Sequence, residues 1–260
     1  FVGSRGLGDV YKRQYEETAV LYRSNAQSRA IEEALLRVSI PYRIYGGLRF
    51  YERLEIKNAI SYLRIIFNNN DNPSFERSIS NPTRGVGEKT LAKIRNAAKQ
   101  FNISYIKASA KLIDEGKISG RGGSGLKDYL EFIAGCKGFI EENSLSDLME
   151  LIIKETGLYA YHAKEAGEKG KTRTENLEEL ITATKNFEQS IKDERTNIEI
   201  AESYLDIISL DSGDRQASEH DDAAQLMTMH SAKGLEFKLV LLTGLEESLF
   251  PHGRSMESAS

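Results

Sequence analysis

The stretch from Gln225 to His252, QLMTMHSAKGLEFKLVLLTGLEESLFPH, contains two short apolar runs separated by a polar turn. The first run ends at Met229 and the second spans Leu239 to Thr243, and both have the length of a strand. Glycine and charges of both signs in the turn allow its backbone to approach a phosphate or a sugar closely. Two such strands indicate a site at the carboxyl end of a parallel sheet. An ordinary strand, turn and strand with a surface Lys–Glu pair explains the same residues, and spacing alone leaves both interpretations open.

A second candidate strand lies near the start of the chain. Residues 18–24, TAVLYRS, form a compact apolar run with β-branched and aromatic members. The spacing predicts a helix from Ala26 to Val38 and a further short strand from Tyr42 to Tyr45. At the end of the first strand, a Tyr22 ring could stack on a base and an Arg23 guanidinium could reach a phosphate. The residues alone favour a plainer role, with Tyr22 in the core and Arg23 in a surface ion pair.

The composition is that of a protein able to bury a core. The chain has 260 residues, of which 40% are hydrophobic and 28% charged, with a net charge of -4. The single cysteine excludes an internal disulfide and favours a reducing cytoplasm. We expect no membrane span, because no run of about 18 apolar residues occurs. Basic residues dominate 23–64 and 84–137 and acidic residues dominate 175–222, so one face could meet a polyanion.

Between these strands the sequence is predominantly helical. The segment 80–87, SNPTRGVG, predicts a Gly-x-Gly turn that opens a helix from Glu88 to Phe101. The unpaired amides of such a helix start can hold a phosphate without reading bases. Apolar stripes continue to about Glu219. Residues 170–172, Gly-Lys-Thr, imitate the end of an ATP-binding loop, but Glu165 replaces the required glycine, so no phosphate role is expected there.

Three separated segments carry a resemblance to a known family. They are AVLYRSNAQSR at 19–29, NPTRGVGEKTL at 81–91 and TMHSAKGLEF at 228–237, with FPH downstream. Each resembles a motif of the superfamily 1 DNA helicases of the UvrD, Rep and PcrA type, and they occur in the family's order. The resemblance implies an α/β fold with a RecA-like parallel sheet domain, discontinuous and incomplete at its carboxyl end, into which an all-α accessory domain is inserted.

The resemblance also implies a domain plan. Residues 1–14 do not look native and are expected to be a disordered leader. The second RecA-like motor domain is expected at 15–88 and again, truncated, at 220–260. The inserted helical domain is expected at 89–219.

Roles for individual residues follow from the family motifs. By resemblance, Arg23 is a catalytic residue that contacts the γ-phosphate of ATP, and Tyr22 stacks on adenine. Gly234 and Glu236 belong to the nucleotide side, where Glu236 would meet the ribose or couple nucleotide to DNA. The implied DNA contacts are those of Asn81, Thr83, Arg84, Thr228 and His230, with Arg49 as a weaker candidate.

The implied activity is that of an ATP-driven motor. Helicases of this kind walk 3′ to 5′ along single-stranded DNA and separate duplex at junctions, in repair or replication. ATP and Mg²⁺ are the implied cofactors, and the Mg²⁺ ligands and the Walker A loop are expected outside these residues. The first RecA-like domain of the longer chain would be the partner in hydrolysis, so this segment should be inactive alone. Two alternatives stay open, the motor subunit of a helicase–nuclease and a helical DNA- or protein-binding module without an ATP role.

Overall fold

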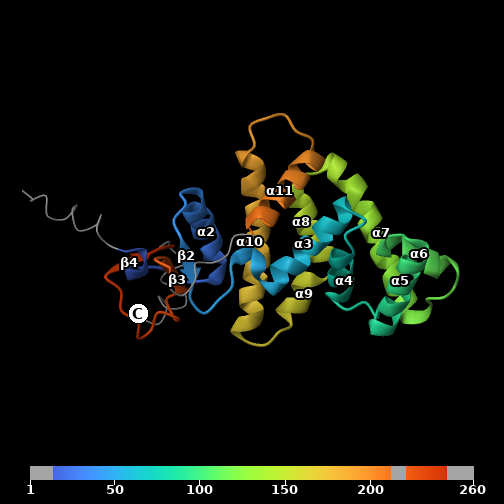
Figure 1. Ribbon diagram of the computed structural model, residues 1–260, viewed down its shortest axis with the longest axis horizontal. Helices are drawn as coiled ribbons and strands as arrows, with labels where there is room; N and C mark the ends of the chain where they lie inside the picture. The colour runs from blue at the N-terminus through green and yellow to red at the C-terminus, as the bar shows by residue number, and fades with distance from the viewer. Residues whose placement is uncertain (1–13, 212–220, 245–260) are drawn as a thin grey trace, which may run out of the picture. The chain divides into compact units, whose positions relative to one another are not determined.

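The structure, a computed structural model, describes residues 14–211 and 221–244, and its chain falls into two compact units (Figure 1). The first unit combines both ends of the chain, residues 1–53 and 212–260, and the second comprises Leu54–Asp211. The expected leader at 1–14 lies outside the described residues, apart from Gln14.

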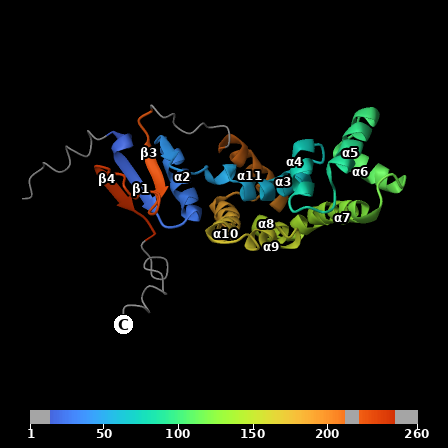
Figure 2. The same cartoon turned by 90° about the horizontal axis from the view of Figure 1, so that it is seen from below.

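A four-stranded parallel sheet forms the centre of the first unit. Its strands are β1 (Thr18–Tyr22), β2 (Tyr42–Ile44), β3 (Ala224–Thr228) and β4 (Leu239–Leu242). Their order is β2-β3-β1-β4, and Figure 2 shows β1 between β3 and β4. Every pairing is parallel. Strands from the two ends of the chain alternate, which confirms both the α/β class and the pairing of the ends in one sheet.

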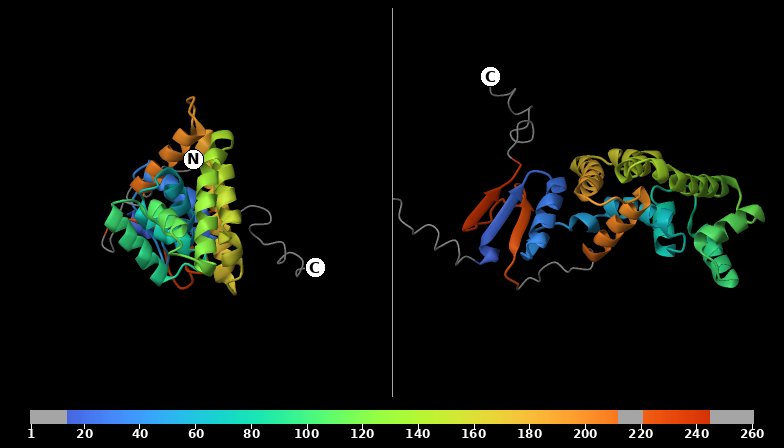
Figure 3. Two further views of the ribbon diagram at one scale, coloured as in Figure 1. Left: turned by 90° about the vertical axis from the view of Figure 1, so that its right-hand side faces the viewer. Right: turned by 90° about the horizontal axis from the view of Figure 1, so that it is seen from above.

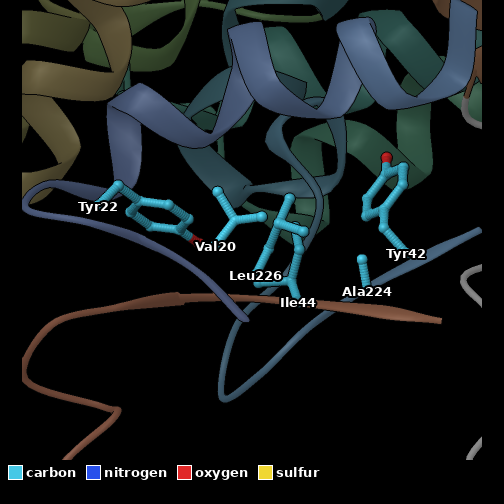
Figure 4. Packing of buried hydrophobic residues seen from close by; sticks show 6 residues of the cluster. All are labelled: Val20, Tyr22, Tyr42, Ile44, Ala224 and Leu226. Carbon is cyan, nitrogen blue, oxygen red and sulfur yellow. The ribbon is translucent and has the colours of Figure 1, made fainter. Parts of the chain in front are cut away.

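In the residues that the structure describes, the sheet buries one face against an amphipathic helix. This helix, α2 (Ser28–Arg37), follows β1 and lies along the strands (Figure 3, right). Alternation along parallel strands puts the buried cluster on the face toward α2, as Figure 4 shows for Val20, Tyr22, Tyr42, Ile44, Ala224 and Leu226. From the helix, Ile31, Leu35 and Leu36 pack onto this cluster. Short 3₁₀ turns complete the described part of the unit, namely η1 (Tyr15–Glu17), η2 (Asn25–Gln27) and η3 (Phe50–Glu52).

The second unit is all helical in the residues described. Its helices are α3 (Leu54–Phe67), α4 (Asn72–Ser80), α5 (Glu88–Phe101), α6 (Tyr105–Asp114), α7 (Gly120–Glu142), α8 (Leu145–Glu155), α9 (Leu158–Ala163), α10 (Glu168–Ser190) and α11 (Asn197–Asp211). Helix α3 is central, because it is buried on nearly every side and packs against α4, α7, α8 and α10. Helices α5 and α6 pack as a pair. The all-α character of the insertion is thereby confirmed.

The division between the units differs from the one expected from sequence. The chain leaves the first unit after Arg53, whereas the sequence placed the boundary at residue 88. The reason is that α3 and α4 bury their apolar faces among the helices of the second unit and not on the sheet. Periodicity identified both helices but could not tell which neighbours they would choose. The later boundary lies at residue 211 and not at 219.

Helix length and hydropathy bear on the expected absence of a membrane span. In residues 14–211 and 221–244, no helix combines the length and the apolar character that crossing a bilayer requires.

Candidate functional site

The carboxyl ends of neighbouring strands meet at one edge of the sheet. Tyr22 ends β1 and is in register with Thr228, which ends β3. The amide of Met229 donates to the carbonyl of Tyr22 at 2.9 Å, so the two strand ends stay paired beyond the last register position. Arg23 follows Tyr22 directly, and His230 lies two residues after Thr228. The fold therefore brings these four predicted site residues to the same edge.

The direction of the connections also changes at this edge. The path from β1 through α2 to β2 crosses β3, and the path from β3 to β4 crosses β1 in the opposite direction. Right-handed crossovers that run in opposite directions lie on opposite faces of a sheet. In α/β folds, ligands bind outside the carboxyl ends of the strands at the point where such connections diverge. The topology thus marks the ends of β1 and β3 as the candidate site.

The loop that carries Arg23 is tightly fastened. The Gln27 side chain accepts hydrogen bonds from the amides of Arg23 at 3.0 Å and Ser24 at 3.1 Å. Ser24 in turn caps the following turn by accepting from the amide of Ala26. The Arg23 side chain is half-buried, and no acceptor within the described residues holds its guanidinium. A fixed backbone with an uncommitted guanidinium is suited to binding an anionic oxygen.

Tyr22 is placed differently from its implied role. Its ring is fully buried beneath α2, in the cluster shown in Figure 4. Burial raises the pKa of its hydroxyl to about 12, and the nearby Arg53 guanidinium opposes this shift. Because no face of the ring is exposed, stacking on a base would require the ring to leave this position. The structure agrees with the plainer role, in which Tyr22 belongs to the core.

A buried polar network surrounds Glu32 of α2, which sequence reasoning missed. Glu32 is 4% exposed, and its carboxylate accepts from the hydroxyl of Ser28 at 2.6 Å, the hydroxyl of Tyr42 at 3.3 Å and the amide of Phe50 at 3.2 Å. The Arg53 guanidinium lies 3.8 Å from the same carboxylate. Buried charges need such partners, since removing water from them is costly. The sequence does contain a signal for this network, namely a glutamate that follows Ile31 on the apolar side of the predicted helix.

Arg49 belongs to this network and not to the protein surface. It is 3% exposed, and its Nε donates to the Tyr42 hydroxyl at 2.9 Å. Its guanidinium also lies over the Tyr42 ring, 5.2 Å from the ring centre. The implied DNA contact of Arg49 does not fit this placement, because a buried side chain with internal partners is not available to a phosphate.

In the turn after β3, Thr228 is held by hydrogen bonds, whereas the His230 side chain is exposed to solvent. The Thr228 hydroxyl lies 2.9 Å from that of Ser231 and accepts from the Ser231 amide at 3.2 Å. The Thr228 carbonyl accepts from the Ala232 amide at 3.1 Å. His230 is exposed at the tip. Both residues stay on the side of the sheet edge where Arg23 lies.

Gly234 and Glu236 are carried away from that edge by the crossover to β4. Gly234 has a φ of 85°, the left-handed conformation in which glycine is favoured. Glu236 lines an open pocket of about 450 Å³ together with Glu17 and Lys238, which precede β1 and β4. Arg23 follows the other end of β1, about 16 Å away for five residues of strand. The structure therefore does not bring Glu236 together with Arg23.

Arg84, in the helical unit, is held inside the protein by its own neighbours. Its guanidinium donates to the backbone carbonyls of Ser78 at 3.1 Å, Pro82 at 2.8 Å and Thr156 at 3.1 Å. It also lies over two rings, 5.4 Å from the centre of Tyr62 and 5.7 Å from that of Tyr129. Three of the five guanidinium N–H donors are thereby committed to the protein. Arg84 fits the task of holding the 81–87 loop better than that of contacting DNA.

Glycines of α7 allow the 81–87 loop to lie close to the helix. A β-carbon at Gly125 would stand 2.1 Å from the carbonyl oxygen of Arg84, and one at Gly122 would stand 2.9 Å from that of Gly85. Only a residue without a side chain permits this approach. The glycine-rich sequence that contains both residues forms the first part of α7.

The other residues of this loop remain accessible. Thr83 is exposed, and Asn81 is half-exposed with its side-chain amide donating to the carbonyl of Arg77 at 2.9 Å. The loop leads into α5. Gly87 occupies the N-cap position of this helix, and no side chain caps it. Backbone amides of the first turn therefore lack a side-chain acceptor, and Thr83 lies beside them in sequence.

Comparison with known proteins decides the family. The UvrD-like helicase C-terminal domain matches residues 9–118 and 131–260. The chain belongs to this family. DNA helicase II of Escherichia coli (strain K12) is 46% identical over 241 residues, which are 93% of this chain and 33% of that protein. ATP-dependent DNA helicase PcrA of Bacillus subtilis (strain 168) is 38% identical over 252 residues, which are 96% of this chain and 34% of that protein. The chain spans about a third of the length of these relatives.

The UvrD-like fold leaves two sequence features without a site. Residues 170–172, which imitate an ATP-binding loop, lie inside α10, where Gly170 packs against the carbonyl of Glu165. In the described part of the chain, no three His, Cys, Asp or Glu side chains gather in a group able to hold a metal ion.

Proposed function

We propose that the protein to which this chain belongs is an ATP-dependent DNA helicase that moves 3′ to 5′ along single-stranded DNA and unwinds duplex in repair or replication. The chain supplies the second RecA-like motor domain and the helical domain inserted into it. The family match and the relatives named DNA helicase II and ATP-dependent DNA helicase PcrA support this function. The protein is proposed to work in the cytoplasm.

Arg23 carries the proposal. It stands at the switch point of the sheet on a loop fixed by Gln27, and its guanidinium has no acceptor among the described residues. Such a side chain fits a phosphate oxygen of ATP presented by the first motor domain. When bound, MgATP supplies the phosphoryl group that is transferred to water. Arg23 stabilises negative charge on that group, a contribution of about 10³- to 10⁵-fold in related enzymes. The Mg²⁺ ligands belong to other parts of the longer protein.

DNA is proposed to contact the exposed polar residues near the strand ends and the 81–87 loop. His230 and Thr228 lie at the sheet edge, and Thr83 with Asn81 lies in the helical unit. Their hydroxyl, imidazole and amide groups bind phosphate or sugar and are indifferent to sequence, which a translocating motor requires. Glu236, in the crossover from β3 to β4 that contains Gly234, is proposed to help couple nucleotide to DNA and not to share a phosphate with Arg23.

The test replaces Arg23 by Ala in the full-length protein. DNA-stimulated ATP hydrolysis should fall by about 10³-fold or more, while the affinity for single-stranded DNA and its dependence on salt stay nearly unchanged. Arg37, exposed at the end of α2, provides the matched control. Its replacement by Ala should leave both properties unchanged. Equal ATP turnover by Arg23→Ala and wild type would refute the motor role of this site.

A further inference from the structure

Arg53 is the residue at which the chain leaves the first unit for the second, and its side chain is buried. It is 8% exposed, and its guanidinium lies 5.3 Å from the centre of the Phe50 ring. Its donors reach three separate acceptors: the Asn25 carbonyl at 2.9 Å, the Ser28 hydroxyl at 2.6 Å and the Leu48 carbonyl at 3.3 Å. A guanidinium with this many donors in a fixed plane can bind all three at once, and an ammonium on a flexible stem cannot.

The Asn25 carbonyl links Arg53 to the loop of Arg23. Asn25 lies two residues after Arg23 and opens the turn η2. Gln27 fastens the start of this loop through two backbone amides, and Arg53 fastens its middle through the Asn25 carbonyl. The Arg23 loop is thus held by the Gln27 side chain from within the loop and by Arg53, which lies 28 positions after Asn25 in sequence.

Glu32 provides the countercharge for Arg53. Its carboxylate lies 3.8 Å from the guanidinium and also accepts from the Ser28 hydroxyl, to which Arg53 donates. Glu32 further accepts from the Phe50 amide, three residues before Arg53. A buried ion pair of this kind costs desolvation and is a weak source of stability, but it specifies one arrangement of the groups around it. The arrangement specified here is that of the Arg23 loop against residues 48–53.

The chain continues from Arg53 directly into α3, the central helix of the helical unit. In the first turn of α3, Glu55 accepts from Asn176 at 2.6 Å. Two turns later, the Tyr62 hydroxyl lies 2.6 Å from the carbonyl oxygen of Ser78 and 2.9 Å from that of Asn81, at the start of the 81–87 loop. Arg53, which holds the Arg23 loop, therefore stands immediately before the helix that carries Tyr62, a neighbour of the first residue of the proposed DNA loop.

From this arrangement we propose that Arg53 is a positioning residue that couples nucleotide binding to DNA binding. A change in the Arg23 loop when nucleotide binds alters the acceptor at Asn25, and Arg53 passes that change to the start of α3. The inference rests on the proposed function. By linkage, the same contact makes DNA binding alter nucleotide affinity to an equal extent.

The test measures coupling and not activity alone. In the full-length protein, the dissociation constant for a single-stranded oligonucleotide is measured with and without a non-hydrolysable ATP analogue, and the ratio of the two is compared among variants. Coupled sites commonly give ratios of about 5 to 150. Arg53→Gln should bring the ratio to within about twofold of one, because the link is lost. Arg53→Lys should also lower it, since the charge remains but the simultaneous hydrogen bonds do not.

Arg29→Gln is the matched control. Arg29 lies in α2 of the same unit, is 5% exposed, and pairs with Glu33 at 2.7 Å, whereas Arg53 reaches Asn25. Arg29→Gln removes a similarly buried guanidinium. The ratio of its DNA dissociation constants with and without the analogue should therefore stay at the wild-type value. Thermal unfolding of every variant accompanies the binding assay. If Arg53→Gln is unfolded at the assay temperature, the ratio of Arg53→Lys decides.

Two results would overturn the proposal. A folded Arg53 variant with the wild-type ratio shows that the contact transmits nothing, and an equal loss in Arg29→Gln shows that any buried guanidinium of this unit has the same effect. Failure of the proposed function is a separate observation, because wild-type protein would then show neither ATP hydrolysis nor any response of DNA affinity to the analogue.

Discussion

The guanidinium of Arg84 donates to the backbone carbonyl of Thr156, 72 residues farther along the chain, at 3.1 Å. This contact joins the loop before α5 to the end of α8. It explains why an arginine in a loop that resembles a DNA-contacting motif is turned toward the protein interior. The exposed residue beside it, Thr83, faces no such partner in the described structure.

We predict that Arg84→Gln lowers the free energy of unfolding of the helical unit by about 3 kcal/mol, because hydrogen bonds from a charged donor contribute roughly 1.5–3 kcal/mol each. Urea denaturation followed by hydrogen exchange of α4 and α8 amides measures the loss. Thr83→Ala is the control, with stability within about 0.5 kcal/mol of wild type and weaker DNA binding. The assignment is wrong if Arg84→Gln weakens DNA binding at unchanged stability.

Gly125 should not tolerate a side chain. Its replacement by Ala places a β-carbon 2.1 Å from the Arg84 carbonyl oxygen, which belongs to the backbone and cannot move aside cheaply. We expect a destabilisation of about 1–3 kcal/mol, typical of overpacking. Gly138 lies in the same helix with nothing within 4 Å of an added β-carbon. Gly138→Ala should therefore stabilise α7 by about 0.5–1 kcal/mol. Thermal unfolding of the two variants compares them directly, and similar behaviour would contradict the close approach of loop and helix.

The burial of Tyr22 predicts a specific response to alkaline pH. Burial raises the pKa of this hydroxyl from 10.0 to about 12 in the folded protein. Because the folded-state value lies above the unfolded one, the stabilisation is complete below pH 10 and is lost as the pH rises toward 12. The tyrosinate absorbance of wild type minus that of Tyr22→Phe should show ionisation near pH 12. Ionisation of this residue near pH 10 would mean that the ring is open to solvent, as base stacking requires.

Acid should act on the helical unit through Glu165. Its carboxylate lies 2.6 Å from Nδ1 of His162 and 2.5 Å from Nη1 of Arg173. The hydrogen bond to His162, followed by that to Arg173, lowers the pKa of Glu165 from 4.5 to about 2. Since the folded-state pKa is depressed, the stabilisation is present above pH 4.5 and is lost as the pH falls toward 2.

Glu165→Gln should remove that part of the acid dependence. We expect its melting temperature to approach that of wild type as the pH falls from 4.5 to 2, with the larger difference at neutral pH. Glu168→Gln changes an exposed carboxylate three residues away and serves as the control. Parallel melting curves for wild type and Glu165→Gln over this range would show that the hydrogen bonds do not persist in solution.

Much of the architecture is contained in local sequence patterns. The apolar runs at Thr18–Tyr22 and Leu239–Leu242 became strands, and the spacing after Gly87 predicted α5 with its observed bounds, Glu88–Phe101. Strong strands on both sides of a long helical segment were sufficient to predict that the two ends share a sheet. These features follow from periodicity and from the need of each apolar face to find cover, both of which are written in short stretches of chain.

The directions of the charged and aromatic site residues were decided only by the tertiary structure. Tyr22 and Arg84 occur in segments that resemble family motifs, and Arg49 was a weaker DNA candidate from the same resemblance, yet each makes its contacts within the protein. Arg84 meets Thr156, and Arg53 meets Asn25, through contacts between residues distant in sequence. A guanidinium binds a carbonyl of the protein or a phosphate of a ligand with the same donors. Which of the two it finds depends on groups that folding alone brings near, and no local pattern contains that information.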